Sequence, residues 1–375
     1  MLCFKSGFKI AFGIEGNKCL ILRIKISRMK FLKLTLFPIA FLYGLVMRIR
    51  NFLYDTNFFK SKQFNFPVIS VGNLTVGGTG KTPHVEFLLR LLSAYKTATL
   101  SRGYKRTTFG FVLADEKASA EIIGDEPFQY YLDFPETTVA VCEKRVIGIE
   151  KIKMLKPETE VIILDDAFQH RAVKPGLNLL ITDFYRRFDT DFMLPTGLLR
   201  EPRSGAGRAD AVLVSKCPAT LSGPEKTALK KSIGKYLKPE TPVFFTTYKY
   251  AETVAFGGQK LLSKKIILVT GIANAEPLIS YLKQAGFQLL AHLNWPDHHH
   301  YSKADVLKIR QEWQSKTEET VSILTTRKDA VKFLQPAFAQ LVNQMPFFYL
   351  PIKVEFLEDR EKFEAMVLKL VKATV

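Results

Sequence analysis

The sequence predicts an α/β protein whose mostly parallel sheet is flanked by helices, with a second, smaller α/β domain and an N-terminal membrane-associated helix. Three observations support this prediction. Apolar stretches of strand length alternate with stretches of helix length along most of the chain. A glycine-rich loop joins one of these strands to a helix, and a later strand ends in two adjacent aspartates. The 375 residues exceed a typical single domain, so two domains are expected.

Residues 1–28 are basic and lack a clear hydrophobic period, whereas Met29 begins a stretch that reads as a natural start. We therefore expect a non-native or disordered extension at 1–28, followed by a membrane-associated helical segment at 29–60. Within that segment, Leu34–Met47 carries no charge and has basic residues at both ends. A spanning helix needs about 20 apolar residues, and Pro38 would kink this shorter run, so a position in the headgroup region is favoured. A core helix and a cleaved signal peptide are the alternatives.

The charge distribution favours a membrane surface as partner. The chain has a formal net charge of +18, and its first 50 residues hold ten Lys or Arg against one acid, a net of +9. Such a segment attracts phosphate, either of nucleic acid or of anionic lipid. Because it lies beside an apolar run, we predict a membrane partner and no nucleic acid. The four scattered cysteines form no CxxC pattern, which fits a reducing compartment.

A phosphate-binding loop (P-loop) is predicted between the short strand Pro67–Val71 and the helix that follows Pro83. Glycines let backbone amides approach phosphate oxygens, and the helix N-terminus adds further donors. Lys81 would reach the β and γ phosphates of a nucleotide, and the Thr82 hydroxyl would ligate Mg²⁺. The common pattern has glycine where Thr75 stands, and a flexible loop with a chance lysine is the alternative. The predicted nucleotide-binding residues are Thr75, Val76, Gly77, Gly78, Thr79, Gly80, Lys81 and Thr82.

A later apolar run, Val161–Leu164, ends in Asp165 and Asp166. This pattern is typical of a buried parallel strand whose C-terminal end faces the ligand crevice. One of the two aspartates is expected to hold Mg²⁺, directly or through water. The residues that follow, Ala167–Arg171, are expected to line the site, with a surface turn as the alternative. The polar loop at 198–202 is a further candidate to face the phosphates.

The pattern of strands and helices restarts after Thr241 and Pro242. Later apolar runs such as Lys265–Thr270 are expected to be strands of a second sheet. We therefore predict a P-loop domain at 61–242 and a smaller α/β domain at 243–375, with a ligand-binding cleft between them.

Two polar clusters are candidates for proton chemistry. Gly124–Pro127 places two carboxylates in a turn, and three histidines follow one another at 298–300. Three histidines suggest a metal, but no matched spacing of His or Cys supports a zinc site. A metal site, a solvated loop and a histidine that supports catalysis all remain open. For phosphoryl transfer to a hydroxyl, a carboxylate base with a supporting histidine is a sound arrangement.

Six motifs occur in an informative order: GNLTVGGTGKTP, SRGY, GDEP, DDAFQHR, LREP and DHHHY. With the apolar N-terminal segment they resemble the tetraacyldisaccharide 4′-kinase family, over nearly the whole chain from Met29. The resemblance implies that the domain at 61–242 is a kinase domain. It implies transfer of the γ-phosphate of ATP, with Mg²⁺, to the 4′-hydroxyl of tetraacyldisaccharide 1-phosphate, forming lipid IVA in lipid A biosynthesis. It also implies a peripheral or monotopic location at the cytoplasmic face of the bacterial inner membrane.

The resemblance implies roles for individual residues. Asp125 would be the base that faces the acceptor hydroxyl, His298 its partner across the cleft, and Lys81 a catalytic contact to phosphate. The family commonly has an acid where Arg327 stands, so this chain departs from the family pattern there. The implied metal ligands are Thr82, Asp165, Asp166 and Glu201, and the implied substrate-lining residues are Glu126, Arg145, Gln169 and His170.

Two other classes of protein compete with a lipid kinase. One is a membrane-associated P-loop ATPase or GTPase that acts as a switch. A GTPase would usually carry an Asn-Lys-x-Asp motif, which this sequence lacks. The other is a basic ATPase that binds nucleic acid, whose charge should lie on the folded body rather than beside an apolar segment. Slow hydrolysis without dependence on an acceptor would favour the switch.

Overall fold

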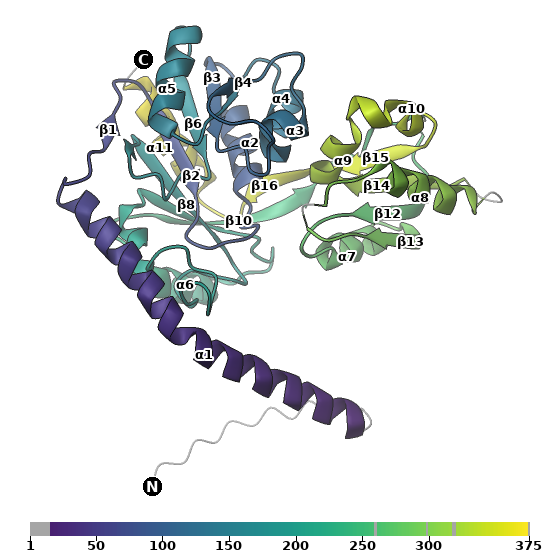
Figure 1. Cartoon of the computed structure of the whole chain (residues 1–375), viewed down its shortest axis with the longest axis horizontal. Helices are drawn as coiled ribbons and strands as arrows, with labels where there is room; N and C mark the ends of the chain where they lie inside the picture. Colours follow the sequence, from purple (N-terminus) through teal and green to yellow (C-terminus); the bar gives the residue numbers. More distant parts are fainter. Residues whose placement is uncertain (1–15, 259–260, 298, 317–319, 374–375) are drawn as a thin grey trace.

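The computed structural model describes residues 16–258, 261–297, 299–316 and 320–373, with side chains from residue 35 onward. Two α/β bodies lie side by side, and one long helix runs along the larger body and extends beyond it (Figure 1). This helix, α1, spans Gly16–Asp55 and continues through Pro38. It includes residues 16–28, which therefore differ from the disordered extension that the sequence predicts. A start of the native chain at Met29 stays a prediction.

The larger body contains a nine-stranded sheet with the strand order β16-β10-β9-β8-β2-β6-β3-β5-β4. Neighbouring strands from β10 to β5 are parallel, and only the two edge strands of this sheet pair antiparallel. The predicted mostly parallel sheet is thus confirmed. Its strands are β2 (Val68–Gly72), β3 (Thr97–Ser101), β4 (Val112–Leu113), β5 (Thr138–Val141), β6 (Val161–Asp165), β8 (Leu177–Asp183), β9 (Ala211–Ser215), β10 (Val243–Tyr250) and β16 (Ile352–Phe356). The short strands β1 (Lys62–Gln63) and β7 (Val173–Lys174) pair separately.

Helices cover both faces of this sheet because alternate residues of a buried strand point to opposite sides. Ile69 and Val71 of β2 share one core with α2, α4 and α11. Val68 shares a core with α5 on the other face, and α6 packs beside β9. The helices are α2 (Lys81–Leu91), α3 (Ala120–Ile123), α4 (Asp125–Asp133), α5 (Arg145–Leu155), η1 (Arg203–Arg208), α6 (Gly223–Gly234) and α11 (Arg360–Lys372).

The smaller body contains a five-stranded sheet with the order β11-β15-β14-β12-β13. Leu278 and Leu282 of α7 pack on one face, and helices α8, α9 and α10 pack on the other. The strands are β11 (Val254–Ala255), β12 (Lys265–Thr270), β13 (Gln288–Asn294), β14 (Ser322–Thr326) and β15 (Phe347–Leu350). The helices are α7 (Glu276–Gln284), α8 (Lys303–Gln314), α9 (Arg327–Phe333), η2 (Pro336–Phe338) and α10 (Ala339–Val342).

The division between the two sheets does not coincide with the expected boundary at residue 243. Strand β10 pairs with β9 of the large sheet, and β16 then pairs with β10. Helix α11 follows, and its Phe363, Val367 and Val371 are buried in the core of the larger body. The smaller body is therefore an insertion between β10 and β16. The turn at Pro242 indicates where a strand begins. It does not indicate which sheet the strand joins, because that depends on pairing with residues distant in the chain.

Candidate active site

The predicted phosphate-binding loop lies between β2 and α2, and Lys81 is the first residue of α2. Gly77 and Gly80 adopt positive φ angles of 98° and 89°, which favour glycine. A Cβ atom at Gly80 would lie 1.8 Å from the Tyr248 hydroxyl oxygen of β10. Residue 80 therefore requires glycine for two reasons, one in its own backbone and one in its neighbour.

Side chains from β9 hold the backbone of this loop. The Lys216 ammonium, just after β9, donates to the Gly78 carbonyl oxygen and to Asp183 at the end of β8. Ser215 donates its hydroxyl to the Thr79 carbonyl oxygen at 2.7 Å. Ser215 and Lys216 are not among the site residues predicted from the sequence. Their position at the end of an apolar strand could have indicated a site role, because the carboxyl ends of parallel strands meet at one edge of a sheet.

His84 links the helix after the loop to β10. Its Nδ1 lies 2.7 Å from the Gly80 carbonyl oxygen and its Nε2 lies 3.0 Å from the Thr246 hydroxyl oxygen. The side chain is buried, and this burial lowers the pKa of His84 to about 4. The imidazole is therefore neutral at physiological pH and serves as a hydrogen-bonding link.

The buried His84 predicts a dependence of stability on pH. In the unfolded chain a histidine has a pKa of about 6.5, so below that pH the unfolded state binds a proton that the folded state does not. We expect His84 to contribute a fall of about 3 kcal/mol in the free energy of unfolding as pH falls from 6.5 to 4. Denaturant unfolding of His84→Gln over this range should show a shallower fall, whereas the exposed-site variant His300→Gln should keep the wild-type slope. Equal slopes for wild type and His84→Gln would contradict this prediction.

The two strand-end aspartates have different environments. Asp165, the last residue of β6, is 1% exposed, and its Oδ2 accepts a hydrogen bond from the Tyr130 hydroxyl at 3.1 Å. Burial, reinforced by the nearby Glu126 carboxylate, raises the pKa of Asp165. Asp166 has a φ of 47° and lies 3.4 Å from the Lys81 ammonium. Burial alone would raise its pKa, but Lys81 and Arg200 outweigh this effect and hold the pKa of Asp166 at about 2.

The P-loop lysine and the acidic strand end therefore come together. Lys81 reaches Asp166 because β2 and β6 are adjacent parallel strands, so the loops after them share one edge of the sheet. The Oδ1 of Asp165 is buried and accepts no hydrogen bond from the described residues. Tyr130 donates to the other oxygen of Asp165 and lies close enough to Thr82 for that side chain to lower its pKa, against the larger effect of burial. The Asp165 carboxylate and the Thr82 hydroxyl, oxygen ligands of the kind that Mg²⁺ prefers, therefore both lie beside Tyr130.

Glu201 forms hydrogen bonds with protein side chains, whereas the sequence predicts that it binds a metal ion. Its side chain is fully buried, and its Oε2 accepts hydrogen bonds from Asn51 of α1 at 3.1 Å and from Arg208 at 2.8 Å. Within the part of the chain that the structure describes, no three His, Cys, Asp or Glu side chains form a group that could hold a metal ion. Glu201 thus joins α1 to the loop before η1, and the metal role expected of Thr82, Asp165, Asp166 and Glu201 stays a prediction.

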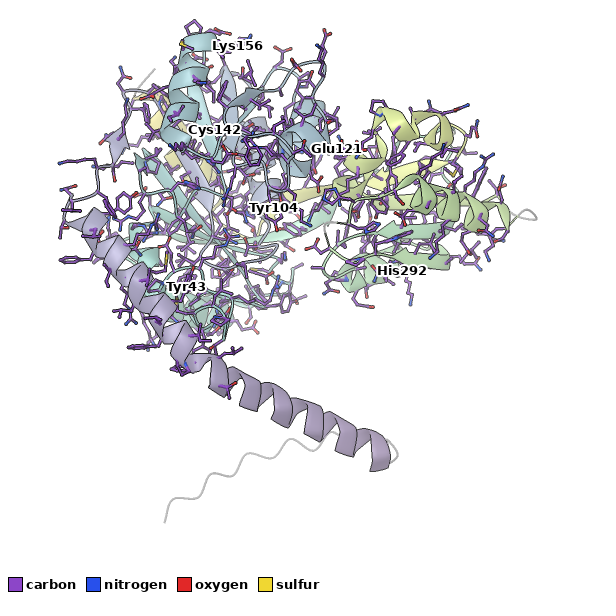
Figure 2. All side chains as sticks on the ribbon, viewed as in Figure 1. Tyr43, Tyr104, Glu121, Cys142, Lys156 and His292 are labelled. Atoms are coloured by element: carbon purple, nitrogen blue, oxygen red, sulfur yellow. The ribbon has the colours of Figure 1, made fainter. Side chains whose placement is uncertain are left out.

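Helix α1 contacts the loops of the site at further points. The Tyr43 hydroxyl, on the side of α1 that faces the larger body (Figure 2), donates to the Arg200 carbonyl oxygen at 2.9 Å. Arg50 donates to the Gln169 carbonyl oxygen at 2.7 Å. The C-terminal half of α1 is thus attached to two of the loops that carry predicted site residues, those after β6 and β8.

The expected substrate-lining residues divide into two kinds. Arg145 is 2% exposed and donates to the Cys142 and Asp165 carbonyl oxygens, so it supports the backbone at the end of β6. The Gln169 side chain donates to the Asn73 carbonyl oxygen at 2.7 Å and ties the loop after β6 to the P-loop. His170 is partly buried. Burial and the charge of Arg145 lower the pKa of His170 to about 4.

The carboxylates Asp125 and Glu126 begin α4, whose last residue is Asp133. Asp125 faces the smaller body, because its Oδ2 lies 3.7 Å from the ammonium of Lys332 in α9. Glu126 lies close enough to Asp165 to raise the pKa of that aspartate. His298, the expected partner of Asp125, lies outside the described residues.

Comparisons with known proteins agree with this geometry. The family described as "Tetraacyldisaccharide-1-P 4'-kinase" (LpxK) matches residues 32–372. A tetraacyldisaccharide 4′-kinase of Flavobacterium psychrophilum is 43% identical over 352 residues, which cover 92% of this chain and 99% of that protein. One of Flavobacterium johnsoniae is 44% identical over 350 residues, covering 92% and 98%. A crystal structure of LpxK from Aquifex aeolicus in complex with ATP superposes with a TM-score of 0.71 at 30% identity, covering 91% of this chain and 99% of that one. The chain therefore belongs to the tetraacyldisaccharide-1-phosphate 4′-kinase family.

Proposed function

We propose that this chain transfers the γ-phosphate of ATP to the 4′-hydroxyl of tetraacyldisaccharide 1-phosphate, which forms lipid IVA in lipid A biosynthesis. One observation carries the proposal: the Lys81 ammonium at the start of α2 lies 3.4 Å from Asp166. At the same edge of the sheet, one buried oxygen of Asp165 has no hydrogen-bond partner among the described residues. A phosphate-binding loop opposite an acidic strand end is what phosphoryl transfer from a nucleotide needs.

The residues of the site suggest how the reaction proceeds. Lys81 and the amides at the start of α2 bind phosphate oxygens and offset the negative charge that develops there. Thr82 and Asp165 would hold Mg²⁺, which would neutralise charge on the β and γ phosphates. Asp125 accepts the proton of the 4′-hydroxyl as the hydroxyl oxygen bonds to the γ phosphorus. The bond from that phosphorus to the β–γ bridging oxygen breaks, and ADP leaves. His298 is assigned as the partner of Asp125.

Helix α1 supports a location at the cytoplasmic face of the inner membrane. Among the described residues, Thr35–Asp55 is the one stretch that is long and apolar enough to cross a membrane. Most of its apolar side chains are exposed, including Phe37, Phe41 and Leu42. The C-terminal half of this helix is attached to the larger body, so we propose that it holds the site at the membrane surface, where the acyl chains of the substrate lie. We expect no nucleic acid as partner.

Transfer of labelled phosphate tests the proposed function. The wild-type chain, incubated with γ-labelled ATP and tetraacyldisaccharide 1-phosphate in detergent micelles, should produce a labelled bisphosphorylated lipid. Omission of the lipid should abolish nearly all consumption of ATP, because the acceptor hydroxyl is the nucleophile. Steady hydrolysis of ATP without labelled lipid would instead favour the membrane-associated switch.

A further inference from the structure

A buried cation links the two bodies of the molecule. Lys332 of α9 is 2% exposed, and its ammonium lies 3.4 Å from Asp329 of the same helix and 3.7 Å from Asp125 of α4. The Tyr301 ring centroid lies 5.7 Å from the same ammonium. An ammonium group that is removed from water is costly unless anions compensate it. Lys332 therefore depends on one carboxylate from its own body and one from the other.

The carboxylate within the smaller body has donors besides Lys332. Asp329 is fully buried; its Oδ2 accepts hydrogen bonds from the Gly271 amide at 2.9 Å and from the Thr326 hydroxyl at 2.8 Å, and its Oδ1 accepts one from the Lys332 ammonium at 3.4 Å. A buried carboxylate with such partners is already hydrogen-bonded. Asp329 is thus placed to hold the ammonium in position, and the group toward which Lys332 extends across the interface is Asp125.

We propose that Lys332 is a positioning residue for phosphoryl transfer, which orients the Asp125 carboxylate and keeps it ionised when the two bodies are in contact. This inference rests on the proposed function, in which Asp125 accepts the proton of the acceptor hydroxyl. A base must be an anion in a fixed orientation to accept that proton, and a buried ammonium nearby favours both conditions. The smaller body thereby contributes a described residue to the site.

A second ion pair at the same interface provides a matched control. Arg327, also in α9, pairs through two nitrogens with Asp133 at the other end of α4, with Nε 2.9 Å from Oδ2. This pair joins the same two helices, but it lies at the opposite end of α4 from Asp125. A loss of activity that merely reflects a weaker interface should therefore appear equally in Arg327→Met and Lys332→Met. The ion pair also explains what Arg327 does at the position where this chain departs from the family pattern: it binds Asp133.

A double-mutant cycle tests the inference with the full chain and the lipid acceptor. We expect Lys332→Met to lower kcat about 100-fold, with the KM for ATP changed less than about twofold. Because Lys332 acts through Asp125, adding Lys332→Met to an Asp125→Asn protein should lower kcat by a further factor of less than about three. Lys332→Arg should recover at least about tenfold of the loss, and Arg327→Met should lower kcat less than about fivefold.

The outcomes separate this inference from the proposed function. If the losses from Lys332→Met and Asp125→Asn multiply, or if Arg327→Met matches Lys332→Met, Lys332 is a structural residue and the inference is wrong. If Asp125→Asn keeps the wild-type rate, the assignment of the base is wrong and the inference falls with it, while lipid labelling by the wild type would still support the kinase reaction. Thermal unfolding identifies variants that do not fold. Should Lys332→Met fail to fold, Lys332→Gln replaces it in the same cycle with the same expectations.

Discussion

Lys81→Met should lower kcat by about three orders of magnitude while the protein stays folded. The ammonium lies at the N-terminus of α2 and pairs with Asp166. Its removal takes away a cation proposed to bind the phosphates and leaves Asp166 paired with Arg200. Methionine keeps the length and the apolar stem of lysine, so the buried part of the side chain still packs. The change in kcat is measured as the rate of phosphate transfer to the lipid acceptor at saturating ATP.

The exposed residue Lys231 of α6 offers a control for this prediction. Lys231→Met also removes one positive charge, and a surface substitution of this kind should change stability by less than about 0.5 kcal/mol. It should retain wild-type turnover. A Lys81→Met protein with more than a tenth of the wild-type kcat would contradict the role of Lys81 in the transfer step.

Gly80→Ala should destabilise the fold by about 3 to 4 kcal/mol and weaken ATP binding by about 100-fold. An alanine at a φ of 89° is strained, and its Cβ would lie 1.8 Å from the Tyr248 hydroxyl oxygen. The loop or β10 must therefore move. Movement of the loop displaces the amides that precede Lys81, and phosphate binding depends on their direction. Denaturant unfolding and titration with ATP measure the two effects.

Two further variants separate strain from the clash. Gly78→Ala places a Cβ atom where no other atom lies within 4 Å, so it should leave the free energy of unfolding nearly unchanged. Tyr248→Phe in the Gly80→Ala background removes the clashing oxygen and leaves the ring carbon at 3.1 Å. It should recover part of the lost free energy of unfolding, and the part that is not recovered measures the backbone strain at residue 80. Equal stability of Gly78→Ala and Gly80→Ala would show that the loop tolerates a side chain at residue 80.

The sequence allowed the P-loop and the acidic strand end to be predicted because both are local patterns. A strand, a glycine-rich loop and a helix follow one another within Pro67–Leu91. The aspartates directly follow the apolar run that becomes β6. Their proximity follows from the fold class, since neighbouring parallel strands bring their carboxyl ends to one edge. Lys81 and Asp166 lie where this rule predicts.

The remaining features depend on pairs that are distant in the chain. Glu201 binds Asn51, 150 residues earlier, and no local pattern around either residue indicates that contact. Whether β10 joined the first or the second sheet depended on pairing with β9 and β16, and its apolar sequence suits a strand of either sheet. Lys332 reads as a surface lysine in a helix, and only the packing of α9 against α4 buries it.

The insertion of the smaller body between β10 and β16 has a consequence for synthesis on the ribosome. The larger body needs β16 and α11 to complete its sheet and its core, and these elements are translated after the whole of the smaller body. The smaller body is complete once β15 has emerged, and it can therefore fold first. Until α11 has been translated, it cannot cover the apolar faces of α2 and of the central strands. A nascent chain that stalls before α11 would leave this apolar surface exposed.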